Sequence, residues 1–418
     1  MLVLTPIYPW VANPQDAVFV RRQVRNLARA GLQCQVLAFR YCPPAVPARL
    51  WRLRYARHLT SCDDEAGFPV HDVFVSRHAV KDADVVPRVV EALEAHIARH
   101  PTLLETRVVY AHWLWPGGAA AIGLRRRFGW PTVAIARGSE MHHWQTTNRH
   151  CRSYVQRVIR ESDRVLANCA GLRDECYRLV PDLEKRIDVA YNGCDPQRFT
   201  PAVNRDAVRR TLGLSPDANL MLCCGSVIER KGIRNLVRGW ERFARVSPDW
   251  QLVVVGRLVE RNLVELLTRT ERVILVGPVD HDQVLAYMQA ANAYVQPSIH
   301  EGLANATMEA MATALPAIAT NTGGQGELIA DGENGLLVPV EDDAALSRAF
   351  ATIATDPRRA REMGALARDT IVRRFSQDRQ VAALAALLEE TTSERHRERD
   401  AVLDCDRAPT KAAVPAPL

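Results

Sequence analysis

The sequence predicts an α/β protein with two doubly wound, Rossmann-like domains that face each other across a central cleft. Its 418 residues exceed what one hydrophobic core usually supports, so we expect two domains of about 200 residues each. Short apolar segments alternate with helix-length segments in both halves of the chain, which is typical of parallel sheets covered by helices. A stretch rich in proline and turn residues separates the two series near residue 200.

The first domain is expected over residues 1–200. An opening apolar strand, a periodic helix from Val18 to Ala30 and a returning strand form a strand-helix-strand unit, and such a short crossover implies parallel strands with a right-handed connection. The pattern then repeats, with strands expected at 1–5, 35–39, 107–111, 132–136 and 164–167. The turn residues between Asn192 and Pro201 mark the linker.

The second domain is expected over residues 201–376, where the same rhythm restarts. Its expected strands are 220–224, 251–255, 272–276, 293–296 and 317–319. A last helix is predicted over residues 377–395, crossing back to the N-terminal domain. Residues 396–418 lack both periodicity and apolar content, so we expect them to be disordered.

Composition indicates an ordinary enzyme that stays in the cytoplasm. The chain is 47% hydrophobic and 24% charged, and its net charge of +6 is too modest for a dedicated nucleic-acid binder. Proline interrupts the N-terminal segment before a signal sequence forms, and no apolar run approaches the roughly 20 residues that span a bilayer. The ten cysteines form no C-x-x-C pair, which favours reduced, buried thiols.

Basic residues gather in three stretches of the N-terminal half. They could contact anionic lipid at the inner face of the cell membrane, although solvated helix faces are the favoured interpretation of any single stretch. The stretches contain Arg21, Arg22, Arg25 and Arg29, then Arg125, Arg126 and Arg127, then Arg149, Arg152, Arg157 and Arg160.

Two carboxylates, Glu301 and Glu309, follow the expected strand that ends at Gln296. Asn305 is a good helix N-cap, and if it caps, Glu309 lies near the first turn of a helix whose N-terminus suits a diphosphate. Gly302 would let the backbone approach a ligand, and each carboxylate can accept hydrogen bonds from the hydroxyls of a sugar or a ribose. The simpler alternative is an acidic residue beside a capped helix. A hydrolase is disfavoured because nothing near Glu301 supplies a second acid separate from the nucleotide site.

The segment from Cys224 to Gly232 combines a strand end, a glycine turn and a helix entry that carries Arg230 and Lys231. A departing diphosphate needs positive charge, which these two side chains could supply in place of a metal. Lysine is rare in this arginine-rich chain, a weak hint that Lys231 is selected, and a surface lysine is the alternative.

The sequence predicts no metal site. The pairs Asp82 with Asp84 and Asp404 with Asp406 have aspartate-x-aspartate spacing, but both lie in polar stretches that indicate solvent exposure. We therefore expect no metal and no cofactor beyond a nucleotide-sugar co-substrate.

These residues resemble the family 4 glycosyltransferases, which have the two-domain GT-B fold and retain anomeric configuration. The matching segments are Glu301 through Glu309, as the E-x7-E motif, Pro316, Gly323-Gly324, Glu327 to Ile329, Asn334 to Val338, Gly225 with Lys231-Gly232, and Asn192 to Asp195 with Phe199 and Pro201. The resemblance implies that Glu301 contacts donor-sugar hydroxyls, Glu309 the ribose and Lys231 the diphosphate. Glu301, Lys231 and Arg230 are our candidate catalytic set, and we expect further donor contacts from Gly225, Ser226, Val279, Gly302, Leu303, Ala304 and Asn305.

The first half is similar to family members that act in bacterial surface-polysaccharide synthesis, where acceptors are often lipid-linked. The similarity lies in Phe19 to Gln23, Ala111 to Trp113 and Arg137 to Glu140, and it implies an acceptor-side cleft lined by Asn13, His112, Arg137 and Gly138. The sequence departs from the family at four positions. Ser226 replaces a phosphate-binding arginine, Arg137 a histidine, and Ala17 and Ala314 replace glycines.

The resemblance implies a metal-independent, retaining hexosyltransferase that uses a UDP- or GDP-linked sugar and a glycan or lipid-linked acceptor. Arg230 is our candidate to compensate for Ser226. Two alternatives stay open at this stage. A nucleotide-sugar epimerase on the same fold would need no acceptor, and a donor-binding scaffold would bind without turnover. The sugar, nucleotide, acceptor and oligomeric state do not follow from the sequence.

Overall fold

The protein is described here by a computed structural model that covers residues 1–9, 17–42, 60–62, 66–76, 85–142 and 150–407. Its contacts divide the chain into two compact units. The first unit comprises Met1–Ala134, Arg157–Val165 and Leu384–Leu418, and the second comprises Ile135–Gln156 and Leu166–Ala383.

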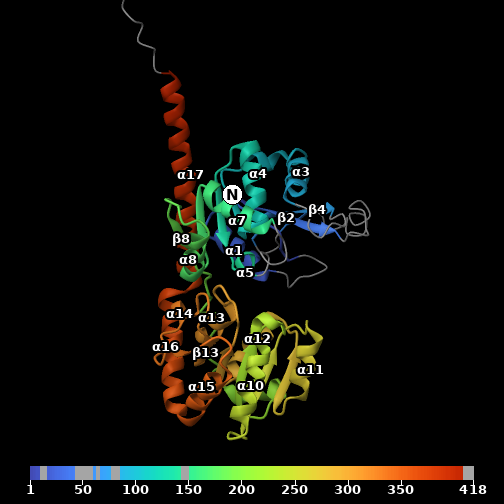
Figure 1. The fold of residues 1–418 in the computed structure, drawn as a ribbon, viewed down its shortest axis with the longest axis vertical. Helices are drawn as coiled ribbons and strands as arrows, with labels where there is room; N and C mark the ends of the chain where they lie inside the picture. The colour runs from blue at the N-terminus through green and yellow to red at the C-terminus, as the bar shows by residue number, and fades with distance from the viewer. Residues whose placement is uncertain (10–16, 43–59, 63–65, 77–84, 143–149, 408–418) are drawn as a thin grey trace, which may run out of the picture. The chain divides into compact units, whose positions relative to one another are not determined.

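The N-terminal part of the chain forms an eight-stranded sheet in the order β3-β4-β2-β1-β5-β6-β7-β8 (Figure 1). The central strand β1 pairs in parallel with both β2 and β5, whereas β3 runs antiparallel to β4. The strands are β1 Leu2–Thr5, β2 Gln35–Cys42, β3 Thr60–Cys62, β4 Pro69–Ser76, β5 Val109–His112, β6 Thr132–Ala136, β7 Arg164–Ala167 and β8 Ile187–Val189.

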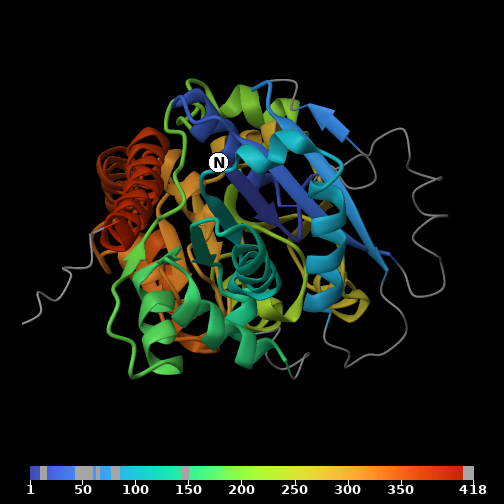
Figure 2. The ribbon, with the colours of Figure 1, turned by 90° about the horizontal axis from the view of Figure 1, so that it is seen from above.

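Amphipathic helices cover this sheet. In α1 the side chains of Val20, Val24 and Leu27 are buried, and their three- and four-residue spacing places them on one face. Figure 2 shows α3 beside the strands of the first unit, where it packs against β4 and α4. The elements are α1 Val18–Arg29, α3 Val86–Ile97, η2 Pro101–Glu105, η3 Leu114–Gly118, α4 Ala119–Phe128, α5 Ser139–His142, α7 Cys151–Glu161 and α8 Ala170–Leu179.

The C-terminal sheet has six strands in the order β11-β10-β9-β12-β13-β14, and every pairing in it is parallel. Its strands are β9 Asn219–Cys224, β10 Trp250–Val255, β11 Val273–Gly277, β12 Ala293–Gln296, β13 Ala317–Thr320 and β14 Gly335–Val338. The helices are α9 Arg205–Thr211, η4 Glu229–Lys231, α10 Ile233–Ala244, α11 Arg261–Arg269, α12 His281–Ala290, α13 Asn305–Ala312, α14 Gln325–Leu328, α15 Asp343–Thr355, α16 Pro357–Arg374 and α17 Gln377–Arg407. Trp240, Phe243 and Phe350 fill the core between α10, α15 and the strands.

The predicted α/β fold with two Rossmann-like sheets is confirmed. Strands β3, β4, β8 and β14 were not predicted as strands. Helix α17 also continues to Arg407, whereas we expected order to end near His396. Residues 393–407 contain no glycine or proline and are rich in glutamate and arginine, which are good helix formers.

Two alanines adopt the left-handed backbone conformation that favours glycine. Ala17 has φ 44° and Ala314 has φ 57°. These are the two positions at which the sequence resemblance led us to expect glycine, so the backbone there keeps a glycine-type turn despite the side chain.

Seven of the ten cysteines are free thiols at buried positions: Cys34, Cys151, Cys169, Cys176, Cys194, Cys223 and Cys224. Burial raises the pKa of Cys34 to about 11 and that of Cys223 to about 12. Within the described part of the chain, no helix combines the length and the apolar character needed to cross a membrane.

Candidate functional site

The second unit has a topological switch point between β9 and β12. From β9 the chain builds outward through β10 to β11, then returns to the other side of β9 to form β12. Open parallel sheets bind ligands at the carboxyl ends of their strands where the winding direction reverses. The loop after β9 carries Arg230 and Lys231, and the loop after β12 carries Glu301.

These two loops meet in an ion-paired cluster at that edge. Lys231 Nζ lies 2.7 Å from Glu301 Oε2, and Arg230 Nη1 lies 3.4 Å from the same oxygen. Arg230 Nη1 also donates to the backbone carbonyl of His300 at 3.0 Å, and the backbone N–H of Ile299 donates to the carbonyl of Arg230 at 2.9 Å. The structure therefore brings together the three residues expected to form the catalytic set.

A chain of buried hydrogen bonds orients the Glu301 carboxylate. The Tyr294 hydroxyl bonds Gln296 Oε1, Gln296 Nε2 donates to Ser298 Oγ at 2.7 Å, and Ser298 Oγ donates to Glu301 Oε2 at 3.2 Å. Burial alone would raise the pKa of Glu301. The charges of Lys231 and Arg230 and the hydrogen bonds from Lys231 and Ser298 outweigh burial, so the pKa lies below its usual value and the carboxylate stays ionised.

Glu309 lies on α13, and its side chain is only 7% exposed. His281, the first residue of α12, holds it, with Nε2 at 3.1 Å from Glu309 Oε1. A capping box between Asp280 and Gln283 fixes the start of α12, and the ring of Phe199 contacts the imidazole edge-on. The carboxylate is therefore oriented by a histidine from a neighbouring helix.

The prediction that Asn305 caps α13 is wrong. Ala304 occupies the N-cap position without a side-chain cap, and Asn305 is the first helical residue. Its Oδ1 instead accepts a hydrogen bond from Asn192 Nδ2 at 3.0 Å, so a tertiary contact takes the atom that a cap would use. Glu309 consequently lies one turn beyond the first turn of the helix.

Arg137, an expected cleft residue, reaches the same region of the second unit. Its Nη1 donates to Asn192 Oδ1 at 2.7 Å, which links the end of β6 to Asn305 through Asn192. The backbone N–H of Arg137 donates to Glu140 Oε1 at 2.8 Å, and Arg137 and Glu140 are both buried. The guanidinium at the position where the family has histidine is thus built into a hydrogen-bonded network.

The loop that carries Glu301 is packed so closely that side chains are excluded at two glycines. A Cβ on Gly302 would lie 2.8 Å from the Asn168 amide, and a Cβ on Gly323 would lie 1.9 Å from the Glu301 carbonyl oxygen. The Gly324 N–H donates to the Gly302 carbonyl at 2.7 Å. A Cβ on Gly138 would lie 3.7 Å from the backbone nitrogen of Gly302. This expected cleft residue therefore also borders the loop.

Gly225 and Ser226 follow β9 at the switch point. Gly225 has φ 153°, and a Cβ there would lie 3.6 Å from Lys231 Cε, so the bare backbone faces the lysine stem. Ser226 Oγ lies 3.4 Å from Nε of Arg257, an exposed residue in the loop after β10. The structure therefore places an arginine, Arg257, beside Ser226.

The remaining predicted residues fall in three places. Leu303 and Ala304 are buried in the turn before α13, and Val279 lies in the loop between β11 and α12. His112 ends β5 in the first unit and is fully buried. Asn13 lies outside the described residues.

Sequence reasoning missed Arg257, His281 and Ser298. Each lies in the loop or the first helical residue after a strand of the C-terminal sheet, so their common signal was a polar residue just beyond a strand end. That signal identifies a site only when the order of the strands is known.

Two family models together match most of the chain. The model described as "Glycosyltransferase Family 4" matches residues 17–198, and the model described as "Glycosyl transferases group 1" matches residues 204–370.

Three named relatives each match more than half of the chain. The chain is 30% identical over 294 residues to the alpha-maltose-1-phosphate synthase of Mycolicibacterium smegmatis, covering 64% of this chain and 75% of that protein. It is 30% identical to the lipopolysaccharide core biosynthesis mannosyltransferase LpsB of Rhizobium meliloti, and the match covers 56% of this chain and 67% of that protein. It is 26% identical to the putative teichuronic acid biosynthesis glycosyltransferase TuaC of Bacillus subtilis, covering 81% and 85%.

Solved structures share the fold over nearly the whole chain. Sucrose-phosphate synthase from Thermosynechococcus elongatus superposes with a TM-score of 0.75 at 22% identity, covering 94% of this chain and 99% of that one. The Anabaena protein HepE in complex with UDP superposes with a TM-score of 0.70 at 17% identity, covering 93% and 99%. At these identities the likeness shows the shared architecture.

Proposed function

Because the chain belongs to the family 4 glycosyltransferases, we propose that it transfers a hexose from a UDP- or GDP-linked donor to a glycan or lipid-linked acceptor with retention of configuration. We place this reaction in the synthesis of a bacterial cell-surface glycan such as exopolysaccharide, capsule or lipopolysaccharide. The proposed location is the cytoplasm, with peripheral contact at the inner face of the cell membrane.

The observation that carries the proposal is the cluster of Lys231, Arg230 and Glu301 at the switch point of the second sheet. It combines two cations, which suit a diphosphate, with an ionised carboxylate, which suits neutral sugar hydroxyls. A related fold has been solved with UDP and with UDP-glucose, in the Anabaena protein HepE, and this supports a nucleotide-sugar donor here.

Each residue then has one proposed task. Lys231 and Arg230 stabilise the negative charge that develops on the diphosphate as the bond to the anomeric carbon breaks. Glu301 accepts hydrogen bonds from the sugar, and Glu309, oriented by His281, accepts them from the ribose. The acceptor oxygen forms the new bond on the same face of the sugar, and its proton passes to a departing diphosphate oxygen.

Ser226 leaves room for a second cation near the diphosphate. Arg230 is our first candidate, because it already contacts the Glu301 carboxylate, and Arg257 is the second, because it contacts Ser226. Arg230→Ala is expected to weaken nucleotide binding more than Arg257→Ala. Unchanged donor affinity in Arg230→Ala would contradict the assignment of Arg230.

Thermal-shift screening against UDP, GDP, ADP and their common sugar conjugates tests the donor site. A ligand that binds only the native protein raises its Tm by mass action. At a ligand concentration of one hundred times Kd, the free energy of unfolding increases by about 2.7 kcal/mol. We expect one nucleotide family to raise the Tm and Glu309→Ala to abolish the shift, whereas Glu333→Ala, at an exposed position, should retain it. The absence of a shift with every ligand, in folded protein, would overturn the proposal.

Turnover assays separate transfer from the alternatives. An epimerase would convert the donor without acceptor, and a scaffold would bind it without turnover. The proposed enzyme should release the nucleoside diphosphate only when acceptor is present. The anomeric coupling in the NMR spectrum of the product should match that of the donor, and added Mg²⁺ or Mn²⁺ should leave the rate unchanged.

A further inference from the structure

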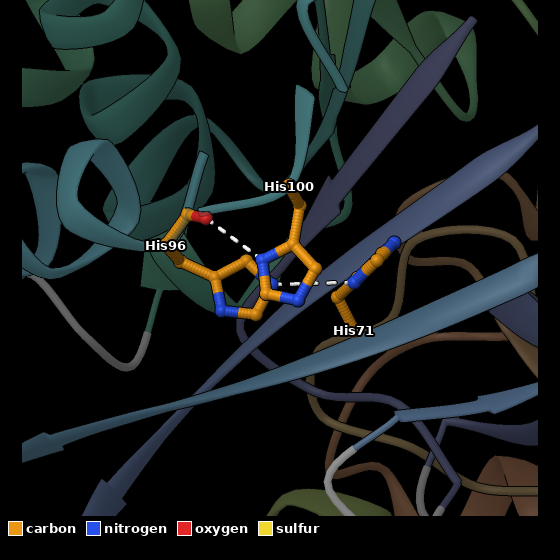
Figure 3. A group of neighbouring side chains, drawn as sticks. All are labelled: His71, His96 and His100. Atoms are coloured by element: carbon orange, nitrogen blue, oxygen red, sulfur yellow. Dashed lines mark hydrogen bonds between the residues drawn. The ribbon is translucent and has the colours of Figure 1, made fainter. Parts of the chain in front are cut away.

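Three histidines of the first unit converge between β4 and the C-terminal end of α3 (Figure 3). His71 lies on β4, His96 in the last turn of α3, and His100 directly before the proline that begins η2. One ring nitrogen of each lies within 4.8 Å of the others. His71 and His96 are buried, and His100 is partly exposed, so the group has one side open to solvent.

One distance in this group is that of a chelating pair. His96 Nε2 and His71 Nδ1 are 3.2 Å apart and share a hydrogen bond that a bound ion would replace. Two nitrogens that each bind a tetrahedral zinc ion at about 2.0–2.1 Å are roughly 3.3 Å from each other. His96 lies in the last turn of α3, which ends at Ile97, and the turn that follows brings His100 back over the His96 ring.

A backbone contact selects the tautomer of the neutral His100 ring. Its Nδ1 lies 2.8 Å from the carbonyl oxygen of His96. A carbonyl oxygen only accepts, so Nδ1 carries the hydrogen and Nε2 keeps its lone pair. Histidines that bind metals commonly donate their second nitrogen to a carbonyl in this way, which sets the tautomer and the orientation of the ring.

The surroundings favour neutral imidazoles, which metal binding needs. Burial, and next the neighbouring charge of His100, lower the pKa of His71. The rings of His96 and His100 stack with their centroids 4.0 Å apart, and both lie edge-on to His71 within about 5 Å, so protonation of more than one ring would be repulsive.

We propose that His71, His96 and His100 bind a divalent transition-metal ion of the zinc type, with one nitrogen from each and solvent at the remaining position. One of the stacked rings of His96 and His100 turns on binding, so that its nitrogen lone pair points at the ion. Three imidazoles select zinc, nickel or copper over magnesium and calcium, which prefer oxygen ligands. The ion would fasten the end of α3 to β4, two elements that already pack together. This site belongs to the first unit and takes no part in the proposed transfer step.

The test uses the full chain without an affinity tag, stripped of metal by a chelator. Co²⁺ is titrated while its visible d–d absorption is followed, and Zn²⁺ is titrated in competition with a chromophoric chelator. We expect one equivalent to bind with a tetrahedral Co²⁺ band. His100→Ala should weaken Zn²⁺ binding by about 100-fold or more, given that loss of an outer-shell partner alone costs about 10- to 100-fold. His150→Ala, at a histidine of the second unit, is the matched control and should bind as the parent does.

His100 is partly exposed, so its substitution should preserve the fold, which circular dichroism would verify. His96→Gln is a second variant at a buried position and should also lose the Co²⁺ band. Affinity should fall as the pH is lowered from 8 to 6, because protons compete for the nitrogens. The proposal is overturned if the parent binds no stoichiometric metal, or if both folded variants bind it unchanged. Neither outcome bears on transfer, because nucleotide binding is not the readout.

Discussion

The two partners of the central ion pair should respond differently to substitution, although Lys231 Nζ and Glu301 Oε2 are only 2.7 Å apart. Lys231→Met removes a cation that acts on the leaving diphosphate. Removing one group that stabilises transition-state charge typically lowers kcat by about 10²- to 10³-fold, or about 2.7–4 kcal/mol. Because the ammonium also attracts the ground-state phosphates, binding of free UDP or GDP should weaken as well.

Glu301→Gln should separate the sugar from the nucleotide. The amide keeps the shape and an oxygen for Ser298, but it releases Lys231 from its ion pair. Free nucleoside diphosphate should therefore bind as tightly as before or more tightly. The sugar loses hydrogen bonds to a charged acceptor, worth about 1.5–3 kcal/mol each, so kcat/KM for the nucleotide-sugar should fall at least about 10-fold.

Calorimetric titration of the free nucleotide and steady-state kinetics with the nucleotide-sugar measure the two effects separately. Glu229→Gln is the control, because this carboxylate lies in the same segment as Lys231 but is paired with the exposed Arg234. The reasoning fails if Glu301→Gln weakens free nucleotide as much as nucleotide-sugar. It also fails if Lys231→Met leaves both nucleotide affinity and kcat unchanged.

Three further predictions concern stability. Ala314→Gly should raise the free energy of unfolding, measured in urea, by about 0.5–1 kcal/mol. The left-handed backbone of Ala314 is strained by about 1–2 kcal/mol, which exceeds the entropy cost of glycine. A destabilised variant would refute this prediction. Asp72→Asn should lower the free energy of unfolding in urea by about 3–5 kcal/mol, because the buried Arg40 guanidinium loses the carboxylate that lies 2.6 Å from it. A decrease of less than 1 kcal/mol would contradict this prediction. The pKa of Glu301 is lower in the folded protein than its ordinary value of 4.5, so the ionised carboxylate stabilises the fold fully above pH 4.5 and loses this effect as the pH falls through the folded value. The Tm should therefore fall more steeply below pH 4.5 in the parent than in Glu301→Gln. Parallel slopes in the two proteins would refute this prediction.

Most of the strands that could be predicted from sequence are buried on both faces, with the partly buried edge strand β11 as an exception. Parallel strands covered by helices form continuous apolar runs, as in Leu220 to Cys224 of β9. Strand β4 interrupts its apolar run with His71 and Asp72, both buried. Their partners, His96 and Arg40, lie 25 and 32 residues away, so local sequence gives no reason to expect these polar groups inside a sheet.

The error at Asn305 has the same physical origin. Asparagine at the start of a helix is ordinarily a cap because its side chain is close to the free backbone N–H groups. Here Asn192, at a distance of 113 residues along the chain, donates to its amide oxygen, and the N-cap position falls on Ala304. The tertiary hydrogen bond overrides the local preference, and Glu309 lies one residue further from the N-cap than a cap at Asn305 would place it.

The same distinction separates the residues of the candidate site that the sequence could identify from those it could not. Lys231 belongs to one short motif, and Glu301 and Glu309 belong to another, so the family resemblance could identify them from local sequence. Arg257 and His281 follow β10 and β11, and their side chains contact Ser226 and Glu309. The order β11-β10-β9-β12 places β10 beside β9 and β11 next to β10. Parallel strands direct all their carboxyl ends to one edge, so a polar residue just past any strand becomes a candidate once the order is known. Strand order is a long-range property of the whole sheet, and it therefore determines which of these residues can act on the same ligand.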